Sequence, residues 1–348
     1  MKLIAIIGAR PQFIKHFPFE RACKDKIDLI TIHTGQHYDK NMSQVFFKQL
    51  GMSSPDFMLD IGSGSHGLQT GRMMIEIEKI ILKTQPDGIV VYGDTNSTLA
   101  GALVASKMHI PLFHVEAGLR SFNRKMPEEV NRVLTDHISD LLFVPSKTAS
   151  KNLKEEGIER GVFEVGDIMK DLVNYVIEEK LLAGMEPEGN YYYATIHRPY
   201  NTDQKERLTE ILEAINELDK KVIFSIHPRT KNLASKYGLN IDTFSNIDFV
   251  EPQAYFSNLA YLKNSSALIT DSGGMQKEAY WLKKKCITVR KETEWTETLS
   301  GNANVLVFDD LLGIKNEVLV APTEWDLNLY GEGNSAHKMI GQILKFHK

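Results

Sequence analysis

Short apolar segments alternate with longer amphipathic segments along the whole chain. Each short segment ends in a glycine or a polar residue, and a helix-like pattern follows it. This alternation is typical of a parallel β-sheet covered by helices. In the first half, the predicted strands are LIAIIG (3–8), LITIHTG (29–35), GIVVYGD (88–94), LFHVEAG (112–118) and DLLFVPS (140–146), with helices in SQVFFKQL (43–50), LQTGRMMIEIEKIILK (68–83), TLAGALVASKM (98–108) and PEEVNRVLTDHIS (127–139).

The same alternation starts again after AGMEPEGN (183–190), a break rich in glycine and proline that is typical of a connection between domains. The second series of predicted strands is YYYATIH (191–197), KVIFSIHP (221–228), IDFVEP (247–252), ALITDSGG (267–274), KCITVR (285–290) and NVLVF (304–308). The final NSAHKMIGQILKF (334–346) reads as a terminal helix. The predicted fold class is therefore α/β, with two similar doubly wound domains.

Composition and charge narrow the class of protein. The chain has 348 residues, enough for two domains, and its 42% hydrophobic and 25% charged residues are typical of a globular protein. A net charge of −4 without a dense Lys/Arg stripe argues against a nucleic-acid partner, and no apolar stretch is long enough to span a membrane. The two cysteines, Cys23 and Cys286, lie far apart in sequence, which fits a reducing cytoplasm.

Charged residues and histidines gather where the predicted strands end. In open parallel sheets, ligands bind beyond the carboxyl ends of the strands. A polar residue at one strand end can also simply begin a solvated loop, but six such ends together favour a cleft between two facing domains. The residues at these ends are Arg10, Asp94, Glu116, His197 with Arg198, His227 with Arg229, and Asp271 with Ser272.

The DSGG segment is a candidate phosphate site. A strand precedes it and a helix follows, so the N–H groups of Ser272, Gly273 and Gly274 would point out of a helix N-terminus and could receive a diphosphate. The alternative is an ordinary Asp/Ser helix cap, which would not require two glycines. Glu278, one turn into this helix, is placed either to reach a ribose hydroxyl or to be a surface charge.

A second cluster of charges lies in HVEAGLRSFNRKMPEEVNR (114–132). Pro127 suits the first turn of a helix, which places Glu128 and Glu129 near its positive end. Arg132 follows Glu128 by four residues, so the two side chains share a helix face. From spacing alone, a surface ion pair is the simpler interpretation of this pattern.

Other motifs argue against a metal site or a redox cofactor. GSGSHG matches G-x-G-x-x-G at Gly62, Gly64 and Gly67, but the next strand-end carboxylate, Asp94, lies about 30 residues on instead of about 20. We interpret these glycines as a lead-in to a helix. His33 and His37 have no evident third metal ligand, and the chain has neither a P-loop motif nor a G-x-S-x-G elbow.

Several motifs in order resemble those of the non-hydrolysing UDP-N-acetylglucosamine 2-epimerases. They are GARPQFIK, HTGQHYDKNM, YGDTNSTLAGA, HVEAGLRSFNRKMPEEVNR, IHPR, DSGGMQKEA and the late YGEGNSA, and they run nearly from end to end of the chain. The resemblance implies a glycosyltransferase-B-like (GT-B-like) architecture of two Rossmann-like domains, residues 1–168 and 169–333, with a terminal helix, residues 334–348, packing back on the first. It also implies a homodimer, a UDP-sugar substrate and no cofactor.

The resemblance also implies roles for individual residues. The catalytic residues would be Asp94, Glu116, Glu128 and His197. The substrate-binding residues would be Arg10, Arg132, His227, Ser272, Gly273, Gly274 and Glu278. The implied reaction removes the C2 proton, expels UDP to give 2-acetamidoglucal, and adds UDP back after a proton arrives on the other face. This route needs acid and base groups and no redox cofactor.

The choice of substrate stays open at this point. Where family members often have HRREN and TERPE, this chain has HRPYN and TEWTE, with Trp295 and Thr296 in the places of arginine and proline. UDP-N-acetylglucosamine, converted to UDP-N-acetylmannosamine for surface polysaccharides, is the first expectation. UDP-2,3-diacetamido-2,3-dideoxyglucuronate is the alternative, because several motifs look closer to enzymes that act on it. A GT-B glycosyltransferase that uses a UDP-sugar is a more distant alternative.

Overall fold

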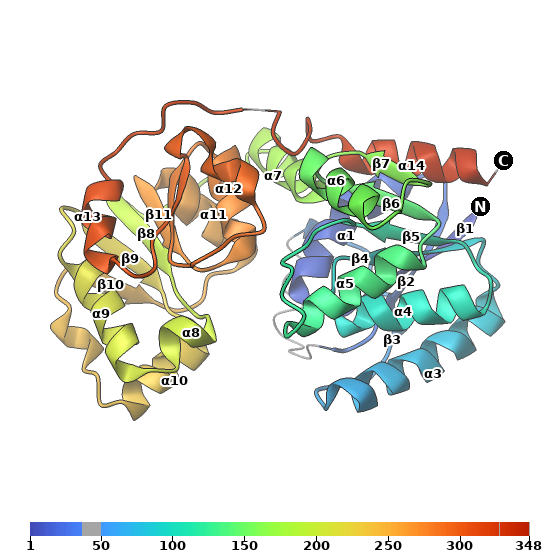
Figure 1. Ribbon diagram of the computed structural model, residues 1–348, viewed down its shortest axis with the longest axis horizontal. Coiled ribbons are helices and arrows are strands. Elements are labelled where there is room, and N and C mark those ends of the chain that lie inside the picture. The colour runs from blue at the N-terminus through green and yellow to red at the C-terminus, as the bar shows by residue number, and fades with distance from the viewer. Residues whose placement is uncertain (37–49, 327, 348) are drawn as a thin grey trace. The chain divides into compact units, whose positions relative to one another are not determined.

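The computed structural model describes residues 1–36, 50–326 and 328–347, without the side chain of Arg10. The chain divides into two compact units: unit 1 comprises Met1–Tyr175 with Asn328–Lys348, and unit 2 comprises Val176–Leu327. Figure 1 shows a sheet with helices in each unit. The helix predicted over residues 43–50, apart from its last residue, and the predicted strand-end His37 lie outside the described residues.

Unit 1 contains a seven-stranded parallel sheet in the order β3-β2-β1-β4-β5-β6-β7. The chain moves outward from β1 in one direction and then, starting at β4, in the other. Ligands of doubly wound folds bind outside this reversal point. The strands are β1 (Lys2–Ile7), β2 (Asp28–His33), β3 (Phe57–Met58), β4 (Gly88–Tyr92), β5 (Leu112–Val115), β6 (Leu141–Val144) and β7 (Val162–Glu164).

Helices cover both faces of this sheet. On one face α3 packs on α4 and α4 on α5, and on the other α14 packs on α1 (Figure 1). Ile6 and Val91 of the sheet and Met73 and Ile77 of α3 are fully buried in the resulting core. The helices of unit 1 are α1 (Arg10–Cys23), α3 (His66–Thr84), α4 (Asn96–Lys107), α5 (Pro127–His137), α6 (Lys147–Glu155), α7 (Ile168–Glu178), which runs on into unit 2, and α14 (Ser335–Phe346).

The terminal helix α14 is fastened to unit 1 by polar and aromatic contacts. The Asp171 carboxylate accepts hydrogen bonds from the N–H groups of Ser335 (3.0 Å) and Ala336 (2.8 Å), which caps the helix. At its other end, the Phe346 ring lies edge-on to Phe113, with 5.7 Å between centroids. The expected return of the terminal helix to the first domain is confirmed.

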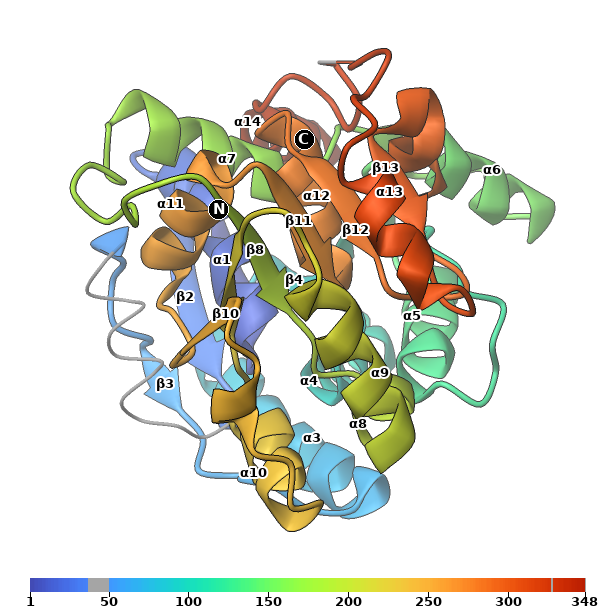
Figure 2. The same ribbon diagram turned by 90° about the vertical axis from the view of Figure 1, so that its left-hand side faces the viewer.

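Unit 2, which faces the viewer in Figure 2, contains a six-stranded parallel sheet in the order β10-β9-β8-β11-β12-β13. This order matches that of the first six strands of unit 1. The expected α/β class with two Rossmann-like units is confirmed. The strands are β8 (Tyr191–Thr195), β9 (Lys221–Ser225), β10 (Ile247–Val250), β11 (Ala267–Thr270), β12 (Lys285–Thr288) and β13 (Asn304–Leu306). The helices are α8 (Pro199–Thr202), α9 (Lys205–Asn216), α10 (Pro228–Lys236), α11 (Tyr255–Asn264), α12 (Gly273–Trp281) and α13 (Ile314–Glu317), with short 3₁₀ turns at Ile241–Thr243, Thr296–Asn302 and Leu311–Gly313.

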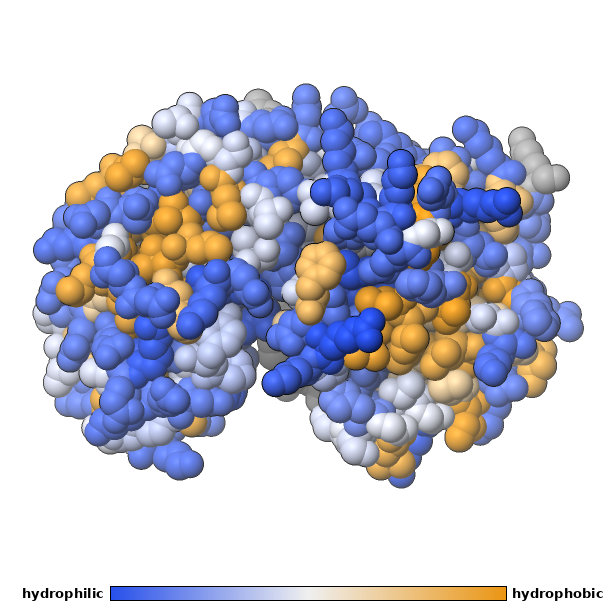
Figure 3. Space-filling model, viewed as in Figure 1, coloured by the Kyte–Doolittle hydropathy of each residue, from blue (hydrophilic) through white to orange (hydrophobic). Residues whose placement is uncertain are grey.

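The surface of unit 1 carries apolar residues on α5. Val130 is 43% exposed and Leu134 46% exposed, and Figure 3 shows apolar residues gathered where this helix lies.

In the part of the chain that the structure describes, no helix has both the length and the apolar character needed to cross a bilayer.

Candidate active site

Asp94 and Glu116 lie on adjacent loops at the carboxyl edge of the unit 1 sheet. Asp94 follows β4 and Glu116 follows β5, and these two strands are hydrogen-bonded neighbours. Gly93, which follows β4 and directly precedes Asp94, has a φ of +63°. A Cβ atom built on it would lie 3.1 Å from Lys15 Nζ and 3.3 Å from Glu116 Oε2. The Glu116 carboxylate and the Lys15 ammonium therefore sit directly against the turn that carries Asp94.

Both carboxylates are paired with a buried cation. Lys15, from α1, forms an ion pair with Glu116, and Arg132, from α5, contacts Asp94 Oδ2 through its NH2 group at 2.5 Å. The Asp94 side chain keeps 30% of its surface exposed. Asp94 is thus held in place and accessible, as a group that exchanges protons with a substrate must be.

Glu129 forms the other half of the Arg132 contact. Its Oε2 lies 2.7 Å from Arg132 NH1, and its carboxylate accepts hydrogen bonds from the N–H groups of Ser121 (2.9 Å) and Phe122 (2.8 Å). Burial acts to raise the pKa of Glu129, but these N–H donors and Arg132 outweigh it and hold the pKa below its ordinary value. Glu129 is therefore a fixed anion.

The expected surface ion pair between Glu128 and Arg132 is wrong. Arg132 turns toward Glu129, three residues before it, because the buried face of α5 carries Glu129 and Arg132, whereas Glu128 is exposed. Glu128 remains at the first turn of α5, where the resemblance places an acid/base group. Its catalytic role stays a prediction.

In unit 2, His197 and Asp271 come together at the reversal point between β8 and β11. Asp271 is completely buried and accepts hydrogen bonds from the N–H groups of His197 (3.0 Å) and Arg198 (2.8 Å) and from Asn201 Nδ2 (3.0 Å). His197 Nδ1 lies 3.2 Å from Asp271 Oδ1. Asp271 therefore fixes both the backbone and the ring of His197.

The charge state of His197 is set by its surroundings. Burial lowers its pKa, the neighbouring Arg198 and Arg229 act in the same direction, and Asp271 opposes them without reversing the shift. A histidine with a lowered pKa is neutral near pH 7 and can both accept and donate a proton.

The DSGG segment forms the start of α12, as the sequence predicts. Of its three expected N–H donors, however, that of Ser272 is already hydrogen-bonded within the protein. Ser272 occupies the cap position without a side-chain capping bond, and its N–H donates to Thr270 Oγ1 at 3.0 Å. Within the described residues, the N–H groups of Gly273 and Gly274 have no partner. A Cβ atom at Gly273 would lie 3.6 Å from Trp295 Nε1 and 3.7 Å from Arg290 NH1. An anion at this helix terminus would therefore meet two glycine N–H groups, with the Arg290 guanidinium and its partner, the Glu294 carboxylate, nearby.

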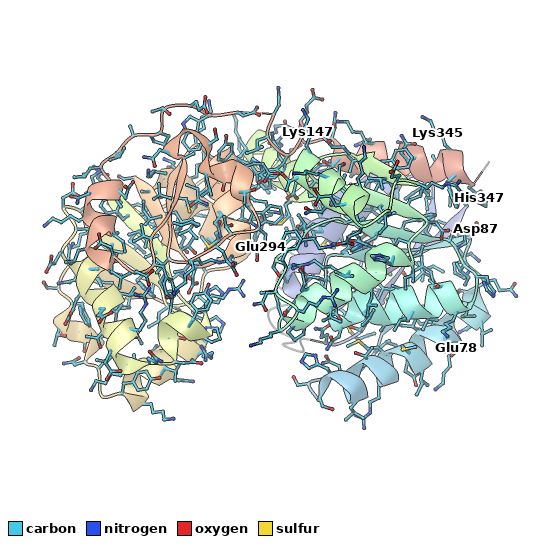
Figure 4. All side chains as sticks on the ribbon, in the orientation of Figure 1. Glu78, Asp87, Lys147, Glu294, Lys345 and His347 are labelled. Carbon is cyan, nitrogen blue, oxygen red and sulfur yellow. The ribbon has the colours of Figure 1, made fainter. Side chains whose placement is uncertain are left out.

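Arg290 and Trp295 belong to the loop after β12, where TEWTE departs from the family pattern. Arg290 donates to both oxygens of Glu294, at 3.1 Å each, and Glu294 is labelled in Figure 4. Trp295 is buried, and its ring lies 3.6 Å from Lys277 Nζ. Trp295, which stands where family members often have arginine, therefore lies beside the N-terminus of α12.

The other predicted binding residues are placed as follows. His227 caps α10 and accepts from Arg229 N–H at 3.2 Å, and its ring centroid lies 5.8 Å from that of His197. Glu278 is only 3% exposed, which excludes a surface charge. Arg10 begins α1, but its side chain lies outside the described residues. In the described part of the chain, no cluster of three His, Cys, Asp or Glu residues could hold a metal ion.

Sequence reasoning missed three contributors to this arrangement. Lys15 lies in the GARPQFIK motif, but neither its residue type nor its spacing marks it as a buried cation. Asn131 donates from Nδ2 to the Asp94 carbonyl at 2.9 Å, and Glu129 holds Arg132. Adjacent residues of a helix lie on different faces, so one of Glu128 and Glu129 is expected to face inward, but the sequence does not indicate which one.

The comparisons with known proteins agree in naming one family. Residues 21–345 match the family described as UDP-N-acetylglucosamine 2-epimerase. A UDP-N-acetylglucosamine 2-epimerase from Methanocaldococcus jannaschii is 47% identical over 100% of both chains. A UDP-2,3-diacetamido-2,3-dideoxy-D-glucuronate 2-epimerase from Pseudomonas aeruginosa is 44% identical over 99% of this chain and 100% of its own.

A solved structure is similar over the same length. The M. jannaschii UDP-GlcNAc 2-epimerase, in complex with UDP-GlcNAc and UDP, has a TM-score of 0.88 and 46% identity, and the match covers 99% of this chain and 100% of that one. Fold, motifs and site residues thus lead to one conclusion: the chain belongs to the UDP-N-acetylglucosamine 2-epimerase family.

Proposed function

We propose that this protein interconverts UDP-GlcNAc and UDP-ManNAc by eliminating UDP and adding it back. The observation that carries the proposal is the pair of strand-end carboxylates in unit 1, Asp94 and Glu116, each held by a cation from a neighbouring helix. The solved relative in complex with UDP-GlcNAc and UDP supports the choice of nucleotide sugar.

The reaction requires a proton to leave C2 and another to arrive on the opposite face. A carboxylate takes the C2 proton, the electron pair of that C–H bond forms the C1–C2 double bond, and the bond from C1 to the diphosphate oxygen breaks. A protonated group then returns a proton to C2 from the other side, and UDP adds again at C1. Asp94, Glu116 and Glu128 are the proposed acid/base groups, with His197 as the fourth.

The departing UDP carries negative charge that the protein must stabilise. We assign this task to the N–H groups of Gly273 and Gly274 at the start of α12, with Arg290 behind them. Ser272, Arg10, Arg132 and His227 would complete the contacts to substrate, and Glu278 would bind the ribose. Electrostatic stabilisation of this kind is worth several kcal/mol when it is strongest in the transition state, about 3–4 kcal/mol for one lost donor.

Product analysis tests this function. Purified protein incubated with UDP-GlcNAc should give a stable mixture with UDP-ManNAc, identified by ¹H NMR, without added cofactor and without accumulation of free UDP. An unchanged substrate, or steady release of UDP, would contradict the proposal.

The second candidate substrate is UDP-2,3-diacetamido-2,3-dideoxyglucuronate, favoured by the Pseudomonas aeruginosa relative at 44% identity. The mechanism would be the same, because the reacting C1 and C2 atoms are the same. Comparing kcat/KM for the two nucleotide sugars decides between them. Turnover of the uronate with none of UDP-GlcNAc would assign the uronate.

A GT-B glycosyltransferase is the more distant alternative. Such an enzyme would need an acceptor and would release UDP permanently, whereas an epimerase converts its nucleotide sugar without an acceptor.

We also propose, from the family resemblance, that the protein is a cytoplasmic homodimer that supplies surface-polysaccharide synthesis. Light scattering of the purified protein would measure its mass directly, and a monomer would contradict the dimer.

A further inference from the structure

A buried histidine connects the two loops that carry Asp94 and Glu116. His114 lies in β5, two residues before Glu116, and none of its surface is exposed. Its Nε2 lies 2.8 Å from the Gly93 carbonyl oxygen, next to Asp94, and its Nδ1 lies 2.7 Å from Asp136 Oδ1 on α5. Neither contact involves substrate, so the proposed reaction does not use this residue directly.

The partners of the ring determine how many protons it carries. A backbone carbonyl can only accept a hydrogen bond, so Nε2 must carry a proton. On the other side, the second oxygen of Asp136 accepts from Arg120 NH1 at 2.7 Å and from Gly118 N–H at 3.1 Å. A carboxylate beside a buried guanidinium is ionised, so Nδ1 must carry a proton as well. Both ring nitrogens of His114 thus face hydrogen-bond acceptors, which is the arrangement that suits an imidazolium.

A charged His114 also fits the charges around the ring. Arg120 contacts both Asp136 and Glu156, with its Nε 2.6 Å from Glu156 Oε1. One guanidinium faces two carboxylates, and a charged His114 supplies the second cation. Buried charges are stable when they are paired and hydrogen-bonded in this way.

The network holds a backbone that would not keep its shape alone. Glu116 has a φ of +69°, a left-handed conformation that costs a non-glycine residue of order 1–3 kcal/mol. Two residues on, Gly118 donates its N–H to Asp136 at 3.1 Å. The Asp136 carboxylate thus fixes the loop on one side of Glu116, while the His114 ring joins the same carboxylate to the turn before Asp94.

We propose that His114 is a positioning residue which, as an imidazolium, sets the separation between Asp94 and Glu116 by donating to Gly93 and to Asp136. This proposal rests on the proposed acid/base roles of those two carboxylates. Removing the link would leave substrate binding in place and misalign the proton transfers. A misplacement of about 1 Å can cost on the order of 10²-fold in rate.

The protonation state can be measured without reference to activity. Long-range ¹H–¹⁵N correlation spectra of histidine-labelled wild-type protein should show both ring nitrogens of His114 protonated at pH 7. His16 is a matched internal control: it is also buried, but it faces Tyr92 and Thr31 hydroxyls, and burial lowers its pKa to about 3, so its ring should be neutral. His114→Gln and His16→Gln assign the two signals. A neutral His114 ring would overturn the proposal.

Kinetics test the positioning role. His114→Phe keeps a ring without donors, and we expect kcat to fall about 10²-fold while KM and the affinity for UDP stay within two-fold. His114→Gln, which keeps one donor, should recover part of the loss, and His337→Gln, at an exposed histidine of α14, should change nothing. Equal loss of UDP affinity, or full kcat in His114→Phe, would overturn the proposal.

The two experiments separate failure of this proposal from failure of the proposed function. If the wild-type protein does not epimerise either nucleotide sugar, the proposed function fails, whatever the NMR spectrum shows. If it does epimerise one and the His114 ring is neutral or dispensable for kcat, the function stands and the positioning role is wrong.

Discussion

At the residue scale, the proposed acid/base groups are the paired carboxylates of unit 1. Asp94→Asn and Glu116→Gln keep the shape and remove the ability to take a proton, so each should lower kcat by about 10²- to 10⁴-fold. Glu128→Gln should do the same, because Glu128 is the third proposed acid/base group. Glu129→Gln is the matched comparison, because it makes the same change at a glutamate that forms an ion pair with Arg132 and is not a proposed acid/base group. Steady-state kinetics measure all four, and near-normal kcat in any of the first three removes that residue from the mechanism.

Gly93 is the residue at which geometry alone can be tested. Gly93→Ala places a methyl group 3.1 Å from Lys15 Nζ and forces a left-handed φ of +63°, at about 1–2 kcal/mol. We expect kcat to fall at least ten-fold and the free energy of unfolding to drop by a similar 1–2 kcal/mol. Gly71→Ala in α3 is the control, since nothing lies within 4 Å of its Cβ position. Unchanged kcat in Gly93→Ala would show that Lys15 and Glu116 do not depend on this turn.

The sequence predicted the strand-end residues well and their partners poorly. Asp94, Glu116, His197 and Asp271 could be found because each follows an apolar run, and parallel strands bring such ends to one edge. The pairing of Arg132 with Glu129 could not, since spacing of three or four residues fits both glutamates equally. Which face of α5 is buried depends on packing against α4, and that information is not local.

At the element scale, Asp271 holds together the loop after β8. It accepts from three donors, so Asp271→Ala would leave buried N–H groups unpaired at about 1–3 kcal/mol each. We expect a lower Tm and a loss of kcat through His197, while Asp271→Asn, which still accepts, should lose less of both. Thermal unfolding and kinetics check this. Equal effects of the two variants would mean that hydrogen-bond acceptance is not what matters.

The packing of α1 on the sheet makes stability depend on pH. Burial lowers the pKa of His16 from 6.5 to about 3, so between these values the unfolded chain binds a proton that the folded chain does not. The free energy of unfolding should therefore fall as pH drops below 6.5, by up to about 1.4 kcal/mol per pH unit from this residue. Urea unfolding at pH 7 and pH 5 should show a smaller pH effect in His16→Gln. Identical pH effects in both proteins would contradict a neutral, buried His16.

Short elements were the least predictable part of the fold. β7 has three residues and no apolar run of its own, and β3 has two, so neither gives a periodic signal. The long alternation of strands and helices, by contrast, predicted both doubly wound units. The first six strands of unit 1 and the six strands of unit 2 have the same relative order, in keeping with the few connections that parallel strands allow.

At the scale of the whole molecule, the chain ends in the unit in which it began. Ile343 of α14 is fully buried, so Ile343→Ala should cost about 2–5 kcal/mol. Hydrogen exchange should then rise in residues 1–175 and not in residues 176–327, because α14 belongs to unit 1. Lys345→Ala, at an exposed residue of the same helix (Figure 4), is the control. Faster exchange confined to unit 2 would contradict this assignment of α14.

The central claim is that C2 of the sugar loses its proton while UDP departs and returns. Incubation of the purified protein with UDP-GlcNAc in D₂O, followed by NMR, tests it most directly. The account predicts that deuterium appears at C2 of both UDP-GlcNAc and UDP-ManNAc, with no acceptor and no added dinucleotide. Epimerised sugar that still carries its original C2 hydrogen would contradict it.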